Sequence, residues 1–178
     1  VGDGVRCSTA RAYLQPARRR DNLEVLQEVS VDRILFDGST ARGVRYRRNG
    51  EMLEASADRE VLVCAGSIGS PAILQRSGIG PAAALKEAGI DVRVDLPGVG
   101  ANLQDHLEVY FQYRCRQPIT LNAKLGLWSR FLIGTRWLLN RSGLGATNHF
   151  ESCAFIRSRA GVRAPDIQFH FLPAAMRY

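Results

Sequence analysis

Residues 65–80 read AGSIGSPAILQRSGIG, and a short apolar run, VLVCA at 61–65, leads directly into them. A continuous apolar run of this length predicts a strand that is buried on both faces. Gly66 then allows a tight turn. Ser70 and Pro71 predict the start of a helix, with serine as the cap and proline at the first helical position.

This helix is expected to end at Ser77–Gly78, and a second short helix is expected between Pro81 and Gly89. Phosphates bind where a buried strand leads through a small-residue turn into a helix. Backbone N–H groups can approach the ligand there, and the helix dipole favours an anion. Many α/β proteins have such a turn for packing alone, so the turn by itself leaves both interpretations open.

The residues before this stretch predict an antiparallel meander of three strands. The strands are expected at 29–36, 41–46 and 52–57, and Asn49-Gly50 is a strong hairpin signal because both turn positions need positive φ. Further upstream, the pattern predicts a short helix that Ser8-Thr9 cap and Pro16 ends, and then a strand-like run at 23–26.

The residues after PGVG at 97–100 have a different character. An alternating strand is expected at 107–114, and another at 166–172, where Phe169 and Phe171 would point into the core. Between them, residues 125–139 predict a helix with a broad apolar face, for which a core or interface position is favoured over a membrane anchor.

We place a domain boundary near Asp105. Residues 1–105 are expected to form part of an α/β, Rossmann-like domain with a β-meander. Residues 106–178 are expected to begin an α+β domain built on an antiparallel sheet.

The composition is that of a globular protein, with 46% hydrophobic and 23% charged residues. The four cysteines and three histidines lack metal-type spacing, so we expect buried or half-buried thiols and no metal site. The net charge is +7, but the one dense basic run, Arg18-Arg19-Arg20, has no interleaved aromatic residues. Nucleic-acid binding is therefore disfavoured.

Residues 65–80 closely match the second signature of the glucose–methanol–choline oxidoreductases. PGVGANLQDH at 97–106 resembles the next segment of that family, and residues 8–13 with 22–26 resemble the approach to its meander. The resemblance implies an FAD-binding domain followed by a substrate domain, in which the flavin takes a hydride from an alcohol carbon.

The resemblance also assigns residues to the cofactor. It implies that the backbone of Val31 holds the adenine and that Ala65-Gly66 lie near the ribose and pyrophosphate. The family's GxGxxG loop and its C-terminal histidine pair have no counterpart in this sequence, and none of the three histidines matches the proton acceptor. We therefore expect no catalytic residue here, and neither tight FAD binding nor turnover by these 178 residues alone.

The stretches GLGATNHFESCAF and DIQFHFLP are most similar to family members that oxidise choline to betaine aldehyde, a step toward glycine betaine. By position, Glu151 would face the trimethylammonium group and His149 would orient the substrate. Phe150, Phe155 and Phe169 are candidate walls of an aromatic cage, because a quaternary ammonium is held by a carboxylate's field and by aromatic faces.

Other interpretations stay open. A glutamate here also occurs in family members that oxidise uncharged aliphatic or polyether alcohols. His149 and His170 could instead be core histidines, and His106 could be structural. A non-enzymatic basic binding module is a further alternative, disfavoured by residues 65–80. A cytoplasmic location is expected, with peripheral membrane association and the choice of electron acceptor left open.

Overall fold

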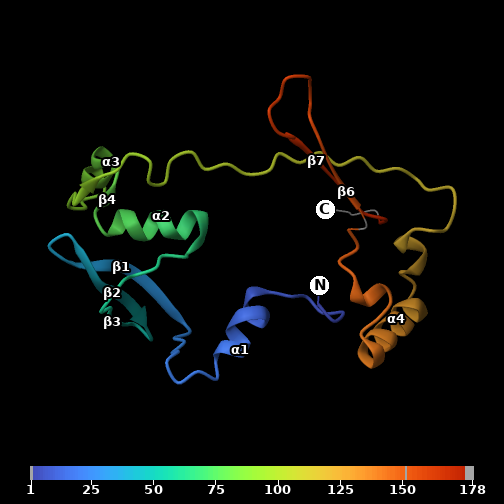
Figure 1. Cartoon of the computed structure of the whole chain (residues 1–178), viewed down its shortest axis with the longest axis horizontal. Coiled ribbons are helices and arrows are strands. Elements are labelled where there is room, and N and C mark those ends of the chain that lie inside the picture. Colours follow the sequence, from blue (N-terminus) through green and yellow to red (C-terminus); the bar gives the residue numbers. More distant parts are fainter. Residues whose placement is uncertain (1, 151, 175–178) are drawn as a thin grey trace. The chain divides into compact units, whose positions relative to one another are not determined.

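The computed structural model describes residues 2–150 and 152–174, and it divides the chain into two compact units. One unit comprises Glu24–Glu108, and the other comprises Val1–Leu23 together with Val109–Tyr178 (Figure 1). Within the described residues, no helix is long and apolar enough to cross a membrane. The boundary expected near Asp105 stays a prediction.

The unit of residues 24–108 begins with the expected antiparallel meander. It consists of β1 (Val29–Asp37), β2 (Thr40–Arg48) and β3 (Glu51–Ser56), in the order β1-β2-β3. Asn49 and Gly50, between β2 and β3, have φ of 51° and 86°, as the hairpin signal requires.

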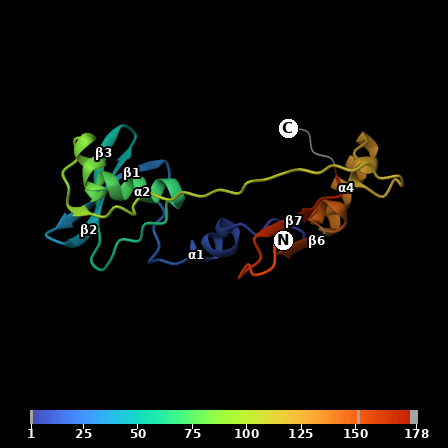
Figure 2. The ribbon, with the colours of Figure 1, turned by 90° about the horizontal axis from the view of Figure 1, so that it is seen from above.

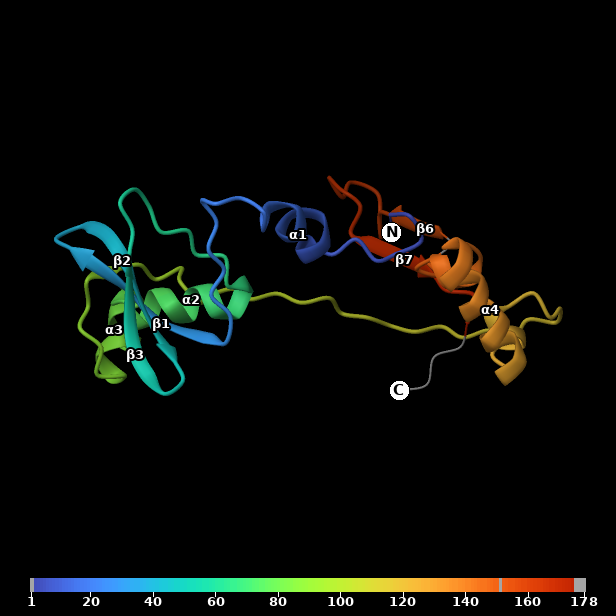
Figure 3. The ribbon, with the colours of Figure 1, turned by 90° about the horizontal axis from the view of Figure 1, so that it is seen from below.

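Helix α2 (Gly66–Arg76) packs beside β1, and α3 (Ala82–Glu87) follows it. A short parallel pair, β4 (Ile79–Gly80) and β5 (Val94–Asp95), completes the unit. Figure 3 shows β1 and α2 side by side and running in the same direction. The buried apolar side chains are Ile34, Ile73 and Leu85, so the small core lies between β1 and the two helices.

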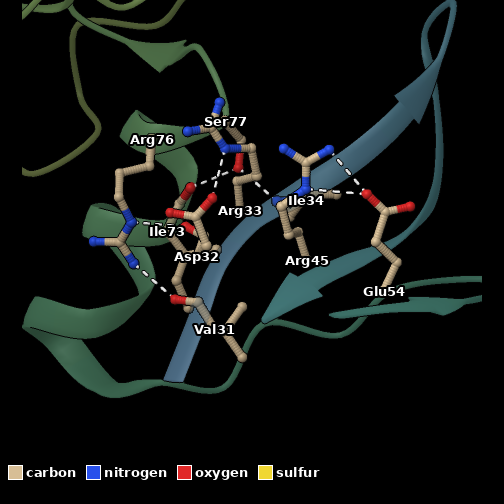
Figure 4. A network of polar contacts seen from close by, with 9 residues as sticks. All are labelled: Val31, Asp32, Arg33, Ile34, Arg45, Glu54, Ile73, Arg76 and Ser77. Atoms are coloured by element: carbon tan, nitrogen blue, oxygen red, sulfur yellow. Dashed lines mark hydrogen bonds and ion pairs between the residues drawn. The ribbon is translucent and has the colours of Figure 1, made fainter. Parts of the chain in front are cut away.

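Two polar side chains at the end of α2 satisfy the open edge of β1. The Ser77 hydroxyl accepts a hydrogen bond from the Ile34 backbone N–H (2.8 Å) and donates one to the Ile73 carbonyl (2.6 Å). The Arg76 guanidinium donates to the carbonyls of Asp32 (2.7 Å) and Val31 (3.1 Å), as Figure 4 shows. These bonds occupy three edge groups in the middle of β1 that would otherwise be free to pair with another chain.

A β-bulge explains why one guanidinium reaches two consecutive carbonyls. Val31 pairs with Tyr46 and Arg33 with Arg45, so Asp32 is an extra residue in β1. Successive carbonyls of a regular strand point to opposite sides, and the extra residue interrupts that alternation. The bulge thus fixes the orientation of the Val31 carbonyl.

Two expectations for residues 61–76 are wrong. Residues 61–65 form no strand, and the Leu62 side chain is 76% exposed. A strand buried on both faces needs neighbouring strands, and the described residues place none beside this run. Helix α2 begins at Gly66 instead of Pro71, and the Ser70 hydroxyl bonds back to the Ala65 N–H (2.9 Å). The expected end at Ser77–Gly78 is confirmed, with Gly78 at φ 83°.

The other unit contains short helical turns, one longer helix and a hairpin. The turns are η1 (Ala10–Leu14), α1 (Gln15–Ala17), η2 (Leu121–Lys124) and η3 (Leu144–Ala146). Helix α4 spans Leu127–Asn140, and Trp137 ties it to the N-terminal segment through an indole N–H bond to the Gly4 carbonyl (2.6 Å). Strands β6 (Ser152–Ile156) and β7 (Ile167–Phe171) form an antiparallel hairpin (Figure 2).

Several expectations for this unit, and for the thiols, are also wrong. Residues 107–114 and 23–26 are not strands. The short helix expected after Ser8-Thr9 is confirmed, because the helical run of η1 and α1 ends at Ala17, one residue beyond Pro16. The four cysteines are exposed, and so are Phe169 and Phe171. A two-stranded hairpin has too few neighbours to bury its side chains, whatever their periodicity.

Removing the Ser77 hydroxyl should destabilise the unit of residues 24–108. Ser77→Ala leaves the N–H of Ile34, a buried residue, without its acceptor, which costs about 1 to 3 kcal/mol. Urea denaturation of the protein measures the loss. Ser56→Ala, on the exposed β3, is the matched control and should change stability little. Equal urea midpoints for Ser77→Ala and Ser56→Ala would contradict the stabilising role of the Ser77 hydroxyl.

The β6–β7 hairpin should weaken in acid. Hydrogen bonds from the Ser158 hydroxyl (2.6 Å) and backbone N–H (2.8 Å) hold the pKa of Asp166 below its ordinary value. A depressed pKa means that the carboxylate stabilises the hairpin above the ordinary pKa of about 3.9, and that this stability is lost as pH falls through the lower folded value.

An NMR titration of the Ser158 amide measures this transition. The midpoint should lie below the ordinary aspartate value, and Asp166→Asn should abolish it. A midpoint at or above the ordinary value would contradict the contact.

Candidate site at the start of helix α2

The N-terminal end of α2 suits an anionic group. Its first turn contains no acidic residue, and the N-cap residue, Ala65, makes no side-chain capping bond. Gly66 has φ 82°, a conformation that side chains disfavour, and a methyl group there would meet nothing within 4 Å. The first N–H groups of an eleven-residue helix therefore face a position with little side-chain bulk and a favourable dipole.

Val31 lies on the same side of the unit. Because β1 and α2 run side by side in one direction, their first residues lie at the same end (Figures 1 and 3). The Val31 carbonyl oxygen accepts a hydrogen bond from the Arg76 guanidinium. Its second lone pair can accept a hydrogen bond from another donor. A shallow hollow of about 200 Å³ opens beside it, lined by Ser30, Val31, Asp32, Arg47, Met52 and Arg76.

The structure places Val31 near the start of β1, and Ala65 and Gly66 at the start of α2, within one unit. Their contact with a cofactor stays a prediction. Arg76 and Ser77, which position β1 against α2, were not predicted from the sequence. The signal was the polar QRS at 75–77, at the C-terminal end of the helix.

Gln75 holds the PGVG turn at 97–100 against helix α2. Its side-chain amide donates to the Val99 carbonyl (3.1 Å). Gly100 has φ 79°, and a methyl group there would lie 2.7 Å from the Gln75 amide nitrogen. The turn at 97–100 therefore favours glycine at position 100, chiefly for its positive φ.

The predicted substrate residues belong to the other unit. His149 has φ 64°, and its Nδ1 lies 3.1 Å from the Thr147 hydroxyl. Its neighbour Phe150 meets the ring of His170 edge-on at 5.6 Å. Glu151 lies outside the described residues. His149 is half-buried and His170 exposed, so neither is a core histidine.

The strand register limits the predicted aromatic cage. Ala154 pairs with Phe169, and Phe155 pairs with Gln168. Directly opposed residues share a face and successive residues alternate, so Phe155 and Phe169 project from opposite faces of the hairpin. They cannot both wall one cage. Phe150 contacts His170, which shares a face with Phe155.

The described residues contain no group of three or more His, Cys, Asp or Glu side chains that could hold a metal ion. His106, the third histidine, is exposed, and its backbone N–H bonds to the Asp105 carboxylate at 2.8 Å.

The sequence model of the GMC oxidoreductases matches residues 1–108, more than half of the chain. The chain belongs to this family. The match covers the meander, α2 and the PGVG turn, so the predicted cofactor residues lie inside it.

Curated relatives match along the whole sequence. The chain is 62% identical over 178 residues to an oxygen-dependent choline dehydrogenase of Photobacterium profundum, and 59% identical to one of Vibrio vulnificus. One from Burkholderia vietnamiensis is 55% identical over 98% of the chain. The chain spans about a third of the length of these relatives, 31 to 32%.

Solved structures agree on the fold. An FAD-dependent oxidoreductase from Chaetomium thermophilum matches 78% of this chain and 24% of its own, with a TM-score of 0.63 and 30% identity. A formate oxidase variant from Aspergillus oryzae matches 78% of this chain and 25% of its own, with a TM-score of 0.69 and 29% identity. These likenesses confirm the expected fold class, which includes part of a Rossmann-like domain.

Proposed function

We propose that the protein is an FAD-dependent dehydrogenase that oxidises choline to betaine aldehyde. The observation that carries the proposal is how far along the chain the sequence identity to the choline dehydrogenases extends. It extends past residue 108, where the family match ends, to residue 178. It therefore includes residues 143–155, the segment that contains the predicted substrate residues His149 and Glu151.

The start of α2 supports the cofactor assignment. An FAD pyrophosphate carries negative charge, and the first N–H groups of α2 with the small Gly66 suit that charge. The backbone of Val31, at the same end, would hold the adenine. The flavin supplies the hydride acceptor when bound, and the residues of this chain hold and orient its non-reacting half.

The charge of choline supports a role for Glu151. A quaternary ammonium donates no hydrogen bond, so its recognition rests on an opposite charge and on aromatic faces. Glu151 would supply the charge. Phe150 and His170, already in edge contact, would supply one aromatic wall, and His149 would orient the hydroxyl end of the substrate.

The cofactor assignment is tested in the complete protein by Gly66→Ala, with Gly89→Ala as the matched control. Both glycines have positive φ, 82° and 70°, and open space around the Cβ position. Each variant should lose about 1 kcal/mol of stability from backbone strain. Only Gly66→Ala should also weaken FAD binding, measured by equilibrium dialysis. Equal FAD affinities in the two variants would remove Gly66 from the cofactor site.

The substrate assignment is tested by anaerobic titration of the complete protein, which includes the segments that these 178 residues lack, with choline while the flavin absorbance bleaches. A neutral analogue with a tert-butyl group in place of the trimethylammonium isolates the effect of charge. Glu151→Gln should weaken choline at least about tenfold, equivalent to 1.4 kcal/mol, and change the analogue little.

Glu51→Gln removes a carboxylate from the other unit and should behave as the parent. If the neutral alcohol reduces the flavin and choline does not, another alcohol is the substrate and Glu151 is a structural carboxylate.

A further inference from the structure

One row of side chains crosses a face of the β1-β2-β3 meander. Ser30 in β1 pairs with Arg47 in β2, and Arg47 pairs in turn with Met52 in β3. Directly opposed residues of an antiparallel sheet project from the same face, so these three side chains lie next to one another. We call Ser30, Arg47 and Met52 the meander row.

The meander row lines the shallow hollow beside Val31. The hollow measures about 200 Å³, and Val31, Asp32 and Arg76 complete its lining. Pockets that hold a whole drug-sized ligand measure roughly 300 to 1,000 Å³, so this hollow suits a single ring system. A ring in the hollow would lie beside the Val31 carbonyl, which can accept one more hydrogen bond.

The other charged groups around the hollow are already paired. Arg33 binds the Asp32 carboxylate at 2.7 Å, and the Arg76 guanidinium donates to the Val31 carbonyl, as Figure 4 shows. Within the described residues, the Arg47 side chain makes no hydrogen bond and no ion pair, and it is exposed. The Arg47 guanidinium is therefore available to a ligand in the hollow.

The chemistry of the hollow selects a flat aromatic ring with an amino group at its edge. A guanidinium is planar and stacks on aromatic faces. The Met52 side chain is 46% exposed, and a thioether makes favourable contacts with aromatic rings. The Val31 carbonyl accepts from a donor at the edge of the ring. A purine with an exocyclic amino group combines these properties.

We propose that Arg47 and Met52 form a platform for the adenine ring of FAD, with the Arg47 guanidinium stacked against the face of the ring. This inference rests on the proposed function, in which the Val31 backbone holds the edge of the same ring. The carbonyl would recognise the amino group, while the platform would recognise the flat ring itself. Arg47 is thus assigned as a binding residue for the non-reacting half of the cofactor.

Calorimetric titration of the complete apoprotein with FAD tests the platform. Arg47→Ala should weaken FAD binding at least about fivefold, because the stacked cation is lost. Arg48→Ala removes the same charge from the next residue, which is also exposed but projects from the opposite face of β2, and should bind FAD as the parent does. Arg47→Lys keeps the charge without the planar group and should recover only part of the lost affinity.

An FAD analogue with hypoxanthine in place of adenine distinguishes the platform from the Val31 contact. The parent should bind this analogue at least about fivefold more weakly than FAD, because an oxygen replaces the amino group that donates to the carbonyl. Equal affinities would overturn the Val31 contact, and the platform with it. If the parent discriminates but Arg47→Ala binds FAD as the parent does, the platform alone is overturned. Full recovery in Arg47→Lys would assign Arg47 to the pyrophosphate charge and would also overturn the platform.

Discussion

The hydroxyl of Ser77 joins the two elements on which the unit of residues 24–108 depends. It accepts from the Ile34 N–H in β1 and donates to the Ile73 carbonyl in α2, and both apolar side chains are buried. Because strand and helix are joined at this point and run in one direction, their first residues lie at the same end. The junction therefore sets how β1, which contains Val31, lies beside the helix that begins at Gly66.

The bulge at Asp32 complements this junction. It turns the Val31 and Asp32 carbonyls toward Arg76, so one guanidinium holds two consecutive peptide groups. The edge of β1 is thereby satisfied by side chains of the helix, and β2 pairs along its other edge. The rigid part of the proposed cofactor site is thus built from backbone groups that a few polar side chains of α2 hold in place.

Local patterns predicted the local structure well. Asn49-Gly50 indicated its turn because the conformation depends on those two residues alone, and Gly78 and Gly89 follow their helices as expected. Long-range structure was predicted poorly. The run at 61–65 and the Phe169–Phe171 stripe have the periodicity of core strands, but burial depends on neighbouring elements that periodicity does not specify.

The same distinction applies to the site. The resemblance indicated Val31, Ala65 and Gly66, and the fold places them within one unit. The roles of Arg76 and Ser77 could not be predicted from local patterns, because their partners lie more than forty residues away along the chain. The register of β6 and β7 could not be predicted from the sequence either. This register places Phe155 and Phe169 on opposite faces of the hairpin.

Hydrogen–deuterium exchange of the complete protein, with and without FAD, tests the central claim most directly. FAD should slow exchange of the amides at 65–69 and around Val31, while the β6–β7 hairpin exchanges as before. Unchanged exchange at 65–69 in the FAD-bound protein would contradict the assignment of the cofactor to the start of α2.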